Sequence, residues 1–266
     1  MLDAGFQIFA STLYGSLPYG VLAVLAGQLA NIHDLILGRP LRRFGGTDPG
    51  WWAWYVLGLA LLLLIWCALW QRQAALAAGG PRSARAELRR TLAAFPSLAG
   101  QTLMVGGALA LIVALAGGSL WMFGDPNALY LAIALLLLPA GLYVIVVYLF
   151  ACPASVLCGM SAVRALAYGA QLLRGKWWRT LLVLTVLAVV ILVLYVLVGV
   201  GAALVLAVTG VPDVAVVTAV SAAAAMVMGA VSLPFVNAML LATFGELRVR
   251  HEGLDLERRI ERAFGS

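Results

Sequence analysis

Six long stretches of the chain contain no Asp, Glu, Lys or Arg, and this spacing of charge constrains the fold more than any other feature of the sequence. The stretches are 4–33, 49–71, 91–124, 126–163, 180–212 and 214–245. A helix needs about 20 apolar residues to cross the hydrocarbon core of a bilayer, and every stretch is long enough. Only 11% of the 266 residues are charged, whereas a soluble domain typically has about 25%. Lipid is therefore the expected solvent for much of the surface.

The apolar runs are typical of helices rather than of barrel strands. Transmembrane strands are segments of about 10 residues in which polarity alternates, and residues 57–70 and 181–201 show no such alternation. We therefore predict an all-α integral membrane protein, with residues 1–266 forming a single polytopic domain of about six transmembrane helices. The predicted spans are about 16–32, 51–71, 97–117, 127–150, 180–209 and 214–244, followed by a charged tail at 245–266.

Amphipathic segments outside the spans predict helices that lie at the membrane interface. Residues 2–15, 83–95 and 161–179 each place apolar side chains on one face at helical spacing. In the second and third segments, Arg side chains occupy the opposite face. Gly175 is expected to end the third helix, because glycine readily takes the left-handed backbone that closes a helix.

The distribution of basic residues predicts the topology. If both termini lie in the cytoplasm, 14 of the 17 Lys and Arg fall on the cytoplasmic side and only three on the other. Short cytoplasmic loops of membrane proteins carry an excess of Lys and Arg. The inverted orientation would place 14 of these residues outside, so we predict cytoplasmic termini.

The sequence offers little of the chemistry that enzymes need. The two histidines, His33 and His251, fall on opposite sides of the membrane in this topology, which excludes a shared metal site or acid–base pair. No HExxH, GxSxG or Walker A pattern occurs. Cys67, Cys152 and Cys158 have no disulfide or zinc spacing and are interpreted as small packing residues. We therefore expect a non-enzymatic protein without a cofactor or a metal, and no nucleic-acid partner.

Polar features inside the spans are few. No ionisable residue is expected in the middle of a span, which argues against proton-coupled transport. Asn237, close to Pro234, is the most prominent intramembrane polar group, and Pro139 is expected to kink or locally break the fourth span. Asn237 is interpreted as a helix-to-helix hydrogen-bonding residue, with a transport path between broken helices as the alternative.

The basic interfacial segments are the best functional candidates. Their candidate contacts with lipid headgroups are Arg85, Arg89, Arg90, Arg164 and Lys176. Each such residue gains about 1 kcal/mol near an anionic membrane surface. The same residues also set topology, and the two roles are compatible.

Two segments carry a resemblance to a known family. Residues 155–184 contain Arg174, Gly175, Trp178 and Arg179 in a pattern similar to ALxxSxxLxRGxxWR, with Gly169 where the pattern has Ser. Residues 244–261 are similar to an aromatic residue and an acidic residue followed by LRxRxEGxDLE. The matching polar positions and glycine are Glu246, Arg248, Arg250, Glu252, Gly253 and Asp255. The chain thus resembles the bacterial membrane-domain family named after glycerophosphoryl diester phosphodiesterase.

This resemblance implies a membrane module in a bacterial inner membrane. It does not imply esterase activity, because the clustered His, Glu and Asp of an esterase barrel are missing. We expect a protein that anchors or organises lipids, or a membrane-protein partner, at the cytoplasmic face. The alternative is a transporter or channel for a lipid or a small amphiphile.

The tail is expected to extend the last span. The helix should continue to about Glu252, supported by the i,i+4 pairs Glu246–Arg250 and Arg248–Glu252. Gly253 should then form a left-handed C-cap, and Asp255 should cap a new short helix at 256–263. The apolar face of that helix is expected to pack near Leu88 or Leu166.

The topology can be tested with reporter fusions. Fusions after Ser119 or Thr209 should report the periplasm, and fusions after Gly80 or Gly175 should report the cytoplasm, because basic loops stay inside. Alkaline phosphatase and green fluorescent protein activities measure the two locations. The reverse pattern would rule out the predicted orientation.

Overall fold

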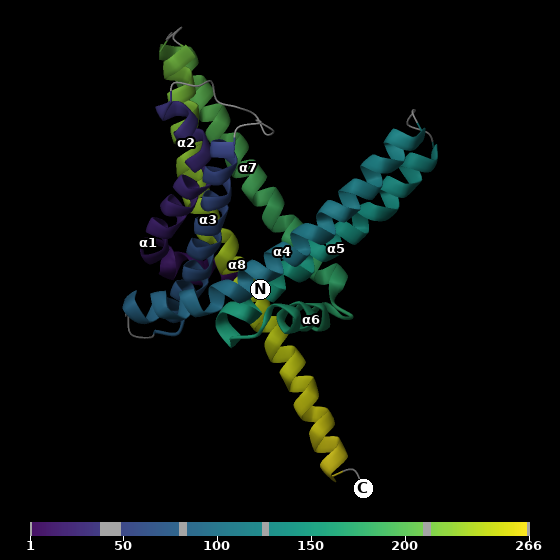
Figure 1. The fold of residues 1–266 in the computed structure, drawn as a ribbon. Helices are drawn as coiled ribbons and strands as arrows, with labels where there is room; N and C mark the ends of the chain where they lie inside the picture. Colours follow the sequence, from purple (N-terminus) through teal and green to yellow (C-terminus); the bar gives the residue numbers. More distant parts are fainter. Residues whose placement is uncertain (1, 38–48, 80–83, 124–127, 210–213, 265–266) are drawn as a thin grey trace. The chain divides into compact units, whose positions relative to one another are not determined.

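The structure is a computed structural model that describes the backbone of residues 2–37, 49–79, 84–123, 128–209 and 214–264. All regular elements of the described residues are helices (Figure 1). They are α1 (Leu2–Gly27), α2 (Leu29–Ile36), α3 (Pro49–Ala77), α4 (Ala84–Phe123), α5 (Ala128–Cys158), α6 (Ala162–Leu173), α7 (Trp177–Thr209) and α8 (Val214–Phe264).

Six of these helices are long and apolar enough to cross a membrane. The segments that meet this requirement are Asp3–Gly27, Pro49–Ala77, Arg85–Leu115, Leu137–Cys158, Trp177–Leu204 and Ala223–Gly253. The predicted fold class, an all-α multi-pass membrane protein, is confirmed.

Two of the predicted interfacial helices are not separate elements. Residues 2–15 belong to α1, and residues 84–95 run without a break into the third span as α4. Pro18 and Pro96 lie inside these helices and do not end them. Each proline removes one backbone hydrogen bond, but no residue with a left-handed backbone stands nearby to reverse the chain. The first span also ends earlier than predicted, because α1 ends at Gly27 and Gln28 separates it from α2.

The third interfacial helix is separate, as predicted. Glycines with positive φ stand on both sides of α6, Gly159 at 66° and Gly175 at 76°. Only glycine adopts this conformation at little cost, so the chain can turn sharply into α6 and out of it. Gly175 therefore closes α6 as the sequence predicted.

The predicted break at Gly253 is wrong. α8 continues through Gly253 to Phe264, and among the described residues positive φ is confined to Gly79, Gly159 and Gly175. A glycine inside a helix costs only about 1 kcal/mol relative to alanine. The residues that follow Gly253 are mostly good helix formers, so the helix continues and Asp255 does not cap a new one. The side chains of 254–264 lie outside the described residues, as does their predicted packing near Leu88 or Leu166.

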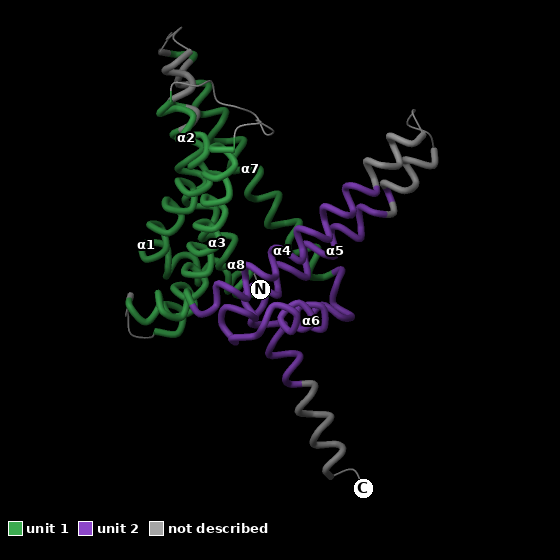
Figure 2. Tube along the Cα trace, in the orientation of Figure 1, with its two compact units in different colours: residues 1–92, 179–243 green, residues 93–178, 244–266 purple. Residues whose placement is uncertain are grey.

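The chain forms two compact units, which are described separately (Figure 2). Unit 1 comprises residues 1–92 and 179–243, and unit 2 comprises residues 93–178 and 244–266. Three helices, α4, α7 and α8, contribute residues to both units.

Close backbone contacts at small residues hold unit 1 together. A Cβ atom added at Gly58 of α3 would lie 2.5 Å from the Ala26 carbonyl oxygen of α1. A Cβ added at Gly20 would overlap the carbonyl oxygen of Ala230 in α8. Pro234 has no N–H to donate to the Ala230 carbonyl four residues earlier. The α1 backbone therefore packs closely on the turn of α8 in which Pro234 removes a backbone hydrogen bond.

Unit 2 packs α6 back along α5. A Cβ at Gly169 of α6 would lie 2.9 Å from the Val147 carbonyl oxygen of α5. The close approach of α5 and α6 therefore depends on glycine at this position. The resembled motif has Ser here. The Ser97 hydroxyl of α4 donates to the Met160 carbonyl (2.7 Å), which ties α4 to the turn before α6.

We expect Gly20→Ala to destabilise the protein and Gly27→Ala to have little effect. The first methyl group would overlap the Ala230 carbonyl oxygen, whereas nothing lies within 4 Å of a Cβ at Gly27. Forcing extra volume into a packed contact typically costs about 1–3 kcal/mol. Thermal unfolding in detergent measures both variants, and equal melting temperatures would contradict the close contact.

Candidate functional site

A chain of hydrogen bonds crosses the interior of unit 1 and joins α3 to α8. The Trp66 indole N–H donates to the Asn237 side-chain oxygen (2.9 Å). The Asn237 amide donates to the Gln73 side-chain oxygen (2.9 Å), and the Gln73 amide donates to the Pro234 carbonyl oxygen (2.9 Å). Asn237 thus forms a helix-to-helix hydrogen bond, in line with its interpretation from the sequence.

The two amide side chains of the network are enclosed by protein, and Trp66 is partly buried. Gln73 and Asn237 are both 0% exposed. A buried polar group without a partner costs about 1–3 kcal/mol, and lipid offers no replacement donor. The three side chains therefore satisfy one another and fix the register of α3 against α8. Sequence reasoning missed Trp66 and Gln73, because a search for charge does not detect neutral side chains in an apolar segment.

A largely buried ion pair involves Arg72, the residue before Gln73 on α3. Arg72 donates to the Glu87 carboxylate at 2.8 Å, with the two side chains 17% and 11% exposed. Glu87 stands in the first turn of α4, where a carboxylate also interacts favourably with the helix dipole. The pair connects α3 to α4 and engages Arg72 inside the protein.

A buried carboxylate that the sequence did not reveal lies on α2. Asp34 is 1% exposed, and neither of its carboxylate oxygens has a hydrogen-bond partner among the described residues. The His33 Nδ1 atom lies 3.7 Å from one of these oxygens, and the His33 ring lies against Trp54. An isolated buried carboxylate is costly, and the His33 imidazole lies beside this one.

Pro139 lies on an exposed face of α5 in unit 2, away from the network residues in sequence and in a different unit. α5 is continuous from Ala128 to Cys158, so the local break that was one expected outcome at Pro139 is absent. Pro139 is therefore not part of the network that contains Pro234 and Asn237.

Two groups can be distinguished among the described arginines. Arg72, Arg248 and Arg250 form ion pairs with Glu87, Glu252 and Glu246 respectively. A second group is exposed and, within the described part of the chain, forms neither a hydrogen bond nor an ion pair. Its members are Arg85, Arg89, Arg90, Arg164 and Arg174. We call these five residues the free arginines.

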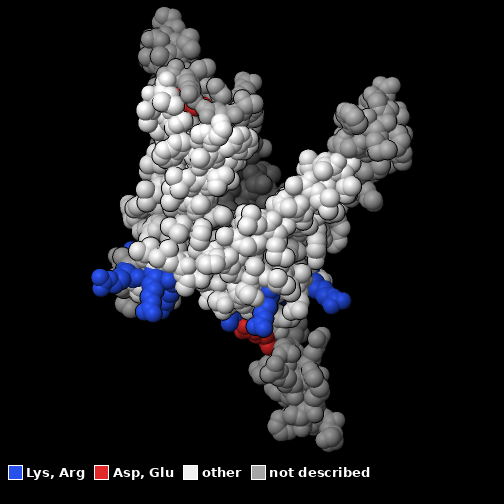
Figure 3. Space-filling model, viewed as in Figure 1, with Lys and Arg blue, Asp and Glu red and all other residues white. Residues whose placement is uncertain are grey.

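The described Lys and Arg side chains lie outside the long charge-free stretches of the helices (Figure 3). Lys176 is partly buried and Arg179 is exposed, and both take part in interactions with other residues. Trp178, between the free arginine Arg174 and the start of the apolar part of α7, is 78% exposed.

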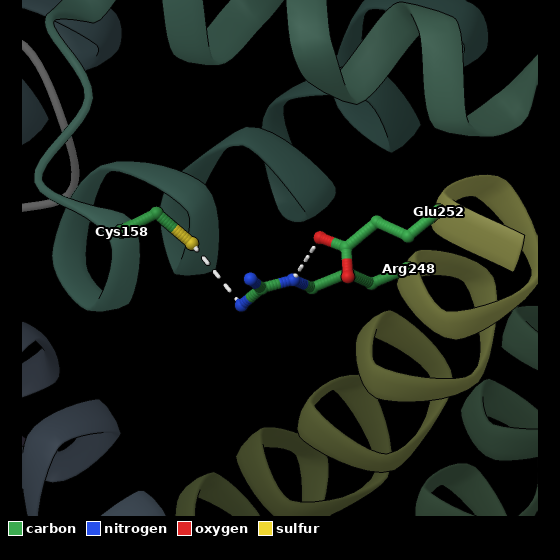
Figure 4. Close-up of polar contacts among 3 residues, drawn as sticks. All are labelled: Cys158, Arg248 and Glu252. Atoms are coloured by element: carbon green, nitrogen blue, oxygen red, sulfur yellow. Dashed lines mark hydrogen bonds and ion pairs between the residues drawn. The ribbon is translucent and has the colours of Figure 1, made fainter. Parts of the chain in front are cut away.

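The charged residues of α8 between Glu246 and Glu252, in unit 2, bind to one another and to their neighbours. The Arg248 guanidinium lies between the Glu252 carboxylate (2.7 Å) and the Cys158 thiol at the end of α5 (3.6 Å) (Figure 4). The His251 ring meets the edge of Tyr168 on α6, with ring centroids 6.2 Å apart. Partial burial, and then the nearby Glu252 carboxylate, raise the pKa of Tyr168 above the ordinary value of a phenol.

The expected ion pairs of the tail are both present. Glu246 and Arg250 are 2.6 Å apart, and Arg248 and Glu252 are 2.7 Å apart. These four residues of the tail motif therefore support the helix, and Arg248 also contacts Cys158 at the end of α5. Gly253 is exposed within the helix, and the side chain of Asp255 lies outside the described residues.

A search for metal ligands among the described residues finds no group of three or more His, Cys, Asp or Glu that is close enough to hold an ion. Cys67 and Cys152 are buried, Cys158 is partly buried, and all three are free thiols. The Cys67 thiol donates to the Thr91 carbonyl oxygen of α4 (3.7 Å).

The polar network predicts coupled effects of substitution. Gln73→Leu and Asn237→Leu should each lower the free energy of unfolding by about 1–2 kcal/mol, because each leaves a buried partner without its hydrogen bond. The double variant should lose clearly less than the sum of the two. Unfolding of all four proteins in detergent gives the double-mutant cycle, and strict additivity would show that the two side chains do not interact.

Comparison of the chain with protein-family models, with curated proteins and with solved structures gives no match. The resemblance to the membrane-domain family named after glycerophosphoryl diester phosphodiesterase therefore rests on the two sequence motifs.

Proposed function

We propose that this protein is a non-enzymatic, multi-pass protein of the bacterial inner membrane that binds and organises anionic lipids at the cytoplasmic face. The single observation that carries this proposal is the contrast between paired and free arginines. Three arginines are paired with carboxylates, and one of these pairs, Arg72–Glu87, is largely buried, whereas five exposed arginines have no partner among the described residues.

The position of the free arginines suits contact with headgroups. Arg85, Arg89 and Arg90 lie in the first two turns of α4, just before its apolar part. Arg164 and Arg174 stand at the start of α6 and directly after it. Guanidinium groups bind phosphate oxygens through two parallel N–H groups. Since each cation gains about 1 kcal/mol at an anionic surface, five of them give a substantial total attraction.

The orientation follows from the same charges. With 14 of the 17 Lys and Arg on one side, the positive-inside rule places that side, and both termini, in the cytoplasm. The resemblance to a bacterial membrane-domain family supports the assignment to the inner membrane. A membrane-protein partner at the same face is compatible with this role, and co-purification of the intact protein would identify it.

The alternative function is transport of a lipid or a small amphiphile. It is based on Pro139, Pro234 and Asn237, because broken helices line transport paths. In unit 1 the Asn237 amide and the Pro234 carbonyl are engaged by Gln73 and Trp66. Groups that bond to one another favour helix packing over a water-filled path, so lipid organisation is the better-supported proposal.

Replacing Arg85, Arg89 and Arg90 by Gln should reduce the enrichment of anionic lipid around the protein. The protein is reconstituted in vesicles of equal phosphatidylglycerol and phosphatidylcholine, extracted mildly, and its retained lipids are quantified. Loss of three cations at about 1 kcal/mol each should lower the preference for phosphatidylglycerol markedly.

The matched control replaces the same three residues by Lys, which keeps the charge and should keep most of the preference. If the wild-type protein retains both lipids in their vesicle ratio, the proposed function is wrong.

A further inference from the structure

Unit 2 contains a cavity where α6 ends and α7 begins. Its volume is about 370 Å³, and its lining comes from α5, from the end of α6, and from the turn into α7. The lining residues are Tyr143, Ala170, Gln171, Leu173, Arg174, Gly175 and Trp177. This volume falls within the range of about 300–1,000 Å³ that is usual for small-molecule sites. We call it the α6–α7 pocket.

The backbone turn leaves the side chains of the pocket available. The Arg174 N–H donates to the Gln171 carbonyl (3.1 Å), and the Lys176 N–H donates to the Leu173 carbonyl (3.0 Å). These two helix-end carbonyls therefore already accept backbone N–H groups, which leaves the side-chain donors of the pocket to a ligand. Gly175, with φ of 76°, permits the reversal that brings Trp177 next to Arg174.

The polar and aromatic groups of the pocket are complementary. The Arg174 and Gln171 side chains are exposed and form no hydrogen bond among the described residues. The Tyr143 and Trp177 rings lie 5.1 Å apart at 45° and form an aromatic wall. Trp177 is also the first residue of the candidate span Trp177–Leu204, which is the level at which tryptophan meets headgroups.

A guanidinium and an amide N–H beside an aromatic wall match one chemical group, a phosphate ester with a partly apolar substituent. Arg174 supplies the charge and two parallel N–H donors, which suit two phosphate oxygens. The aromatic wall suits the glycerol and ester region of a phospholipid. A quaternary ammonium compound that lacks a phosphate would be repelled by the arginine.

We propose that the α6–α7 pocket binds the phosphate group of a single glycerophospholipid, with Arg174 as its principal ligand. This inference rests on the proposed function, but it is narrower. The free arginines attract anionic lipid as a diffuse surface, whereas the pocket holds one headgroup by its phosphate. Since phosphatidylcholine also carries a phosphate, the pocket should retain one lipid whether or not the lipid has a net charge.

The test compares Arg174→Gln with Arg164→Gln. Both substitutions remove one exposed and unpaired arginine from the α6 region, but only Arg174 lines the pocket. Native mass spectrometry counts phospholipids retained after extraction from pure phosphatidylglycerol and from pure phosphatidylcholine vesicles. Wild type and Arg164→Gln should each keep one tightly held lipid, and Arg174→Gln should retain it roughly tenfold more weakly. Arg174→Lys should fall between them, because it keeps the charge and loses the paired donors.

The outcomes separate the two proposals. Equal losses for Arg164→Gln and Arg174→Gln would overturn the pocket and leave diffuse lipid attraction standing. A selective loss for Arg174→Gln in a protein without preference for phosphatidylglycerol would support the pocket and overturn the proposed function. In a third arm, inorganic phosphate is added to lipid-free protein in detergent. If it raises the melting temperature of wild type but not of Arg174→Gln, and no lipid is retained, the site belongs to a soluble phosphate and the lipid assignment is wrong.

Discussion

A membrane interior contains no water that could satisfy a polar group, and the packing of unit 1 follows from this constraint. Pro234 removes one N–H from α8 and leaves the Ala230 carbonyl without its usual donor. The α1 backbone closes on that carbonyl at Gly20, where any side chain would overlap it. One turn further along, Gln73 donates to the Pro234 carbonyl and binds Asn237, which in turn accepts from Trp66. A proline in α8 is thus accommodated by a glycine from α1 and an amide from α3.

The cost of burying an unpaired polar group also bears on which arginines are paired with carboxylates. Where an arginine is largely buried, as Arg72 is, a carboxylate accompanies it. Where the position is open, arginines without partners remain, and their free energy is lowest next to anionic headgroups. The arginines of the tail motif of α8 are exposed and nevertheless paired, with Glu246 and Glu252. These pairs support the helix in unit 2, whereas the proposed contacts with lipid fall on α4 and on the region around α6.

Whether a helix ends near a glycine depends on whether that glycine adopts the left-handed backbone conformation. Gly159 and Gly175 do so, and they separate α6 from the spans on either side. Gly253 does not, although its sequence context is just as compatible with a helix end, and α8 passes through it. Pro18 and Pro96 are likewise absorbed into long helices. Tertiary packing decides whether a glycine adopts the left-handed conformation, because the chain reverses where the next element can pack against another one. α6, for example, packs back against α5.

The sequence by itself determined that the protein is helical and crosses a membrane, since charge-free segments of that length have no other stable environment. It also identified α6, the closing glycine at 175, the ion pairs of the tail and the intramembrane asparagine. Only the tertiary structure decided which polar side chains meet, as Trp66 and Gln73 do at Asn237, because partners 164 and 171 residues apart leave no local pattern. It alone separated paired from free arginines and formed the α6–α7 pocket, because both depend on how helices approach in space.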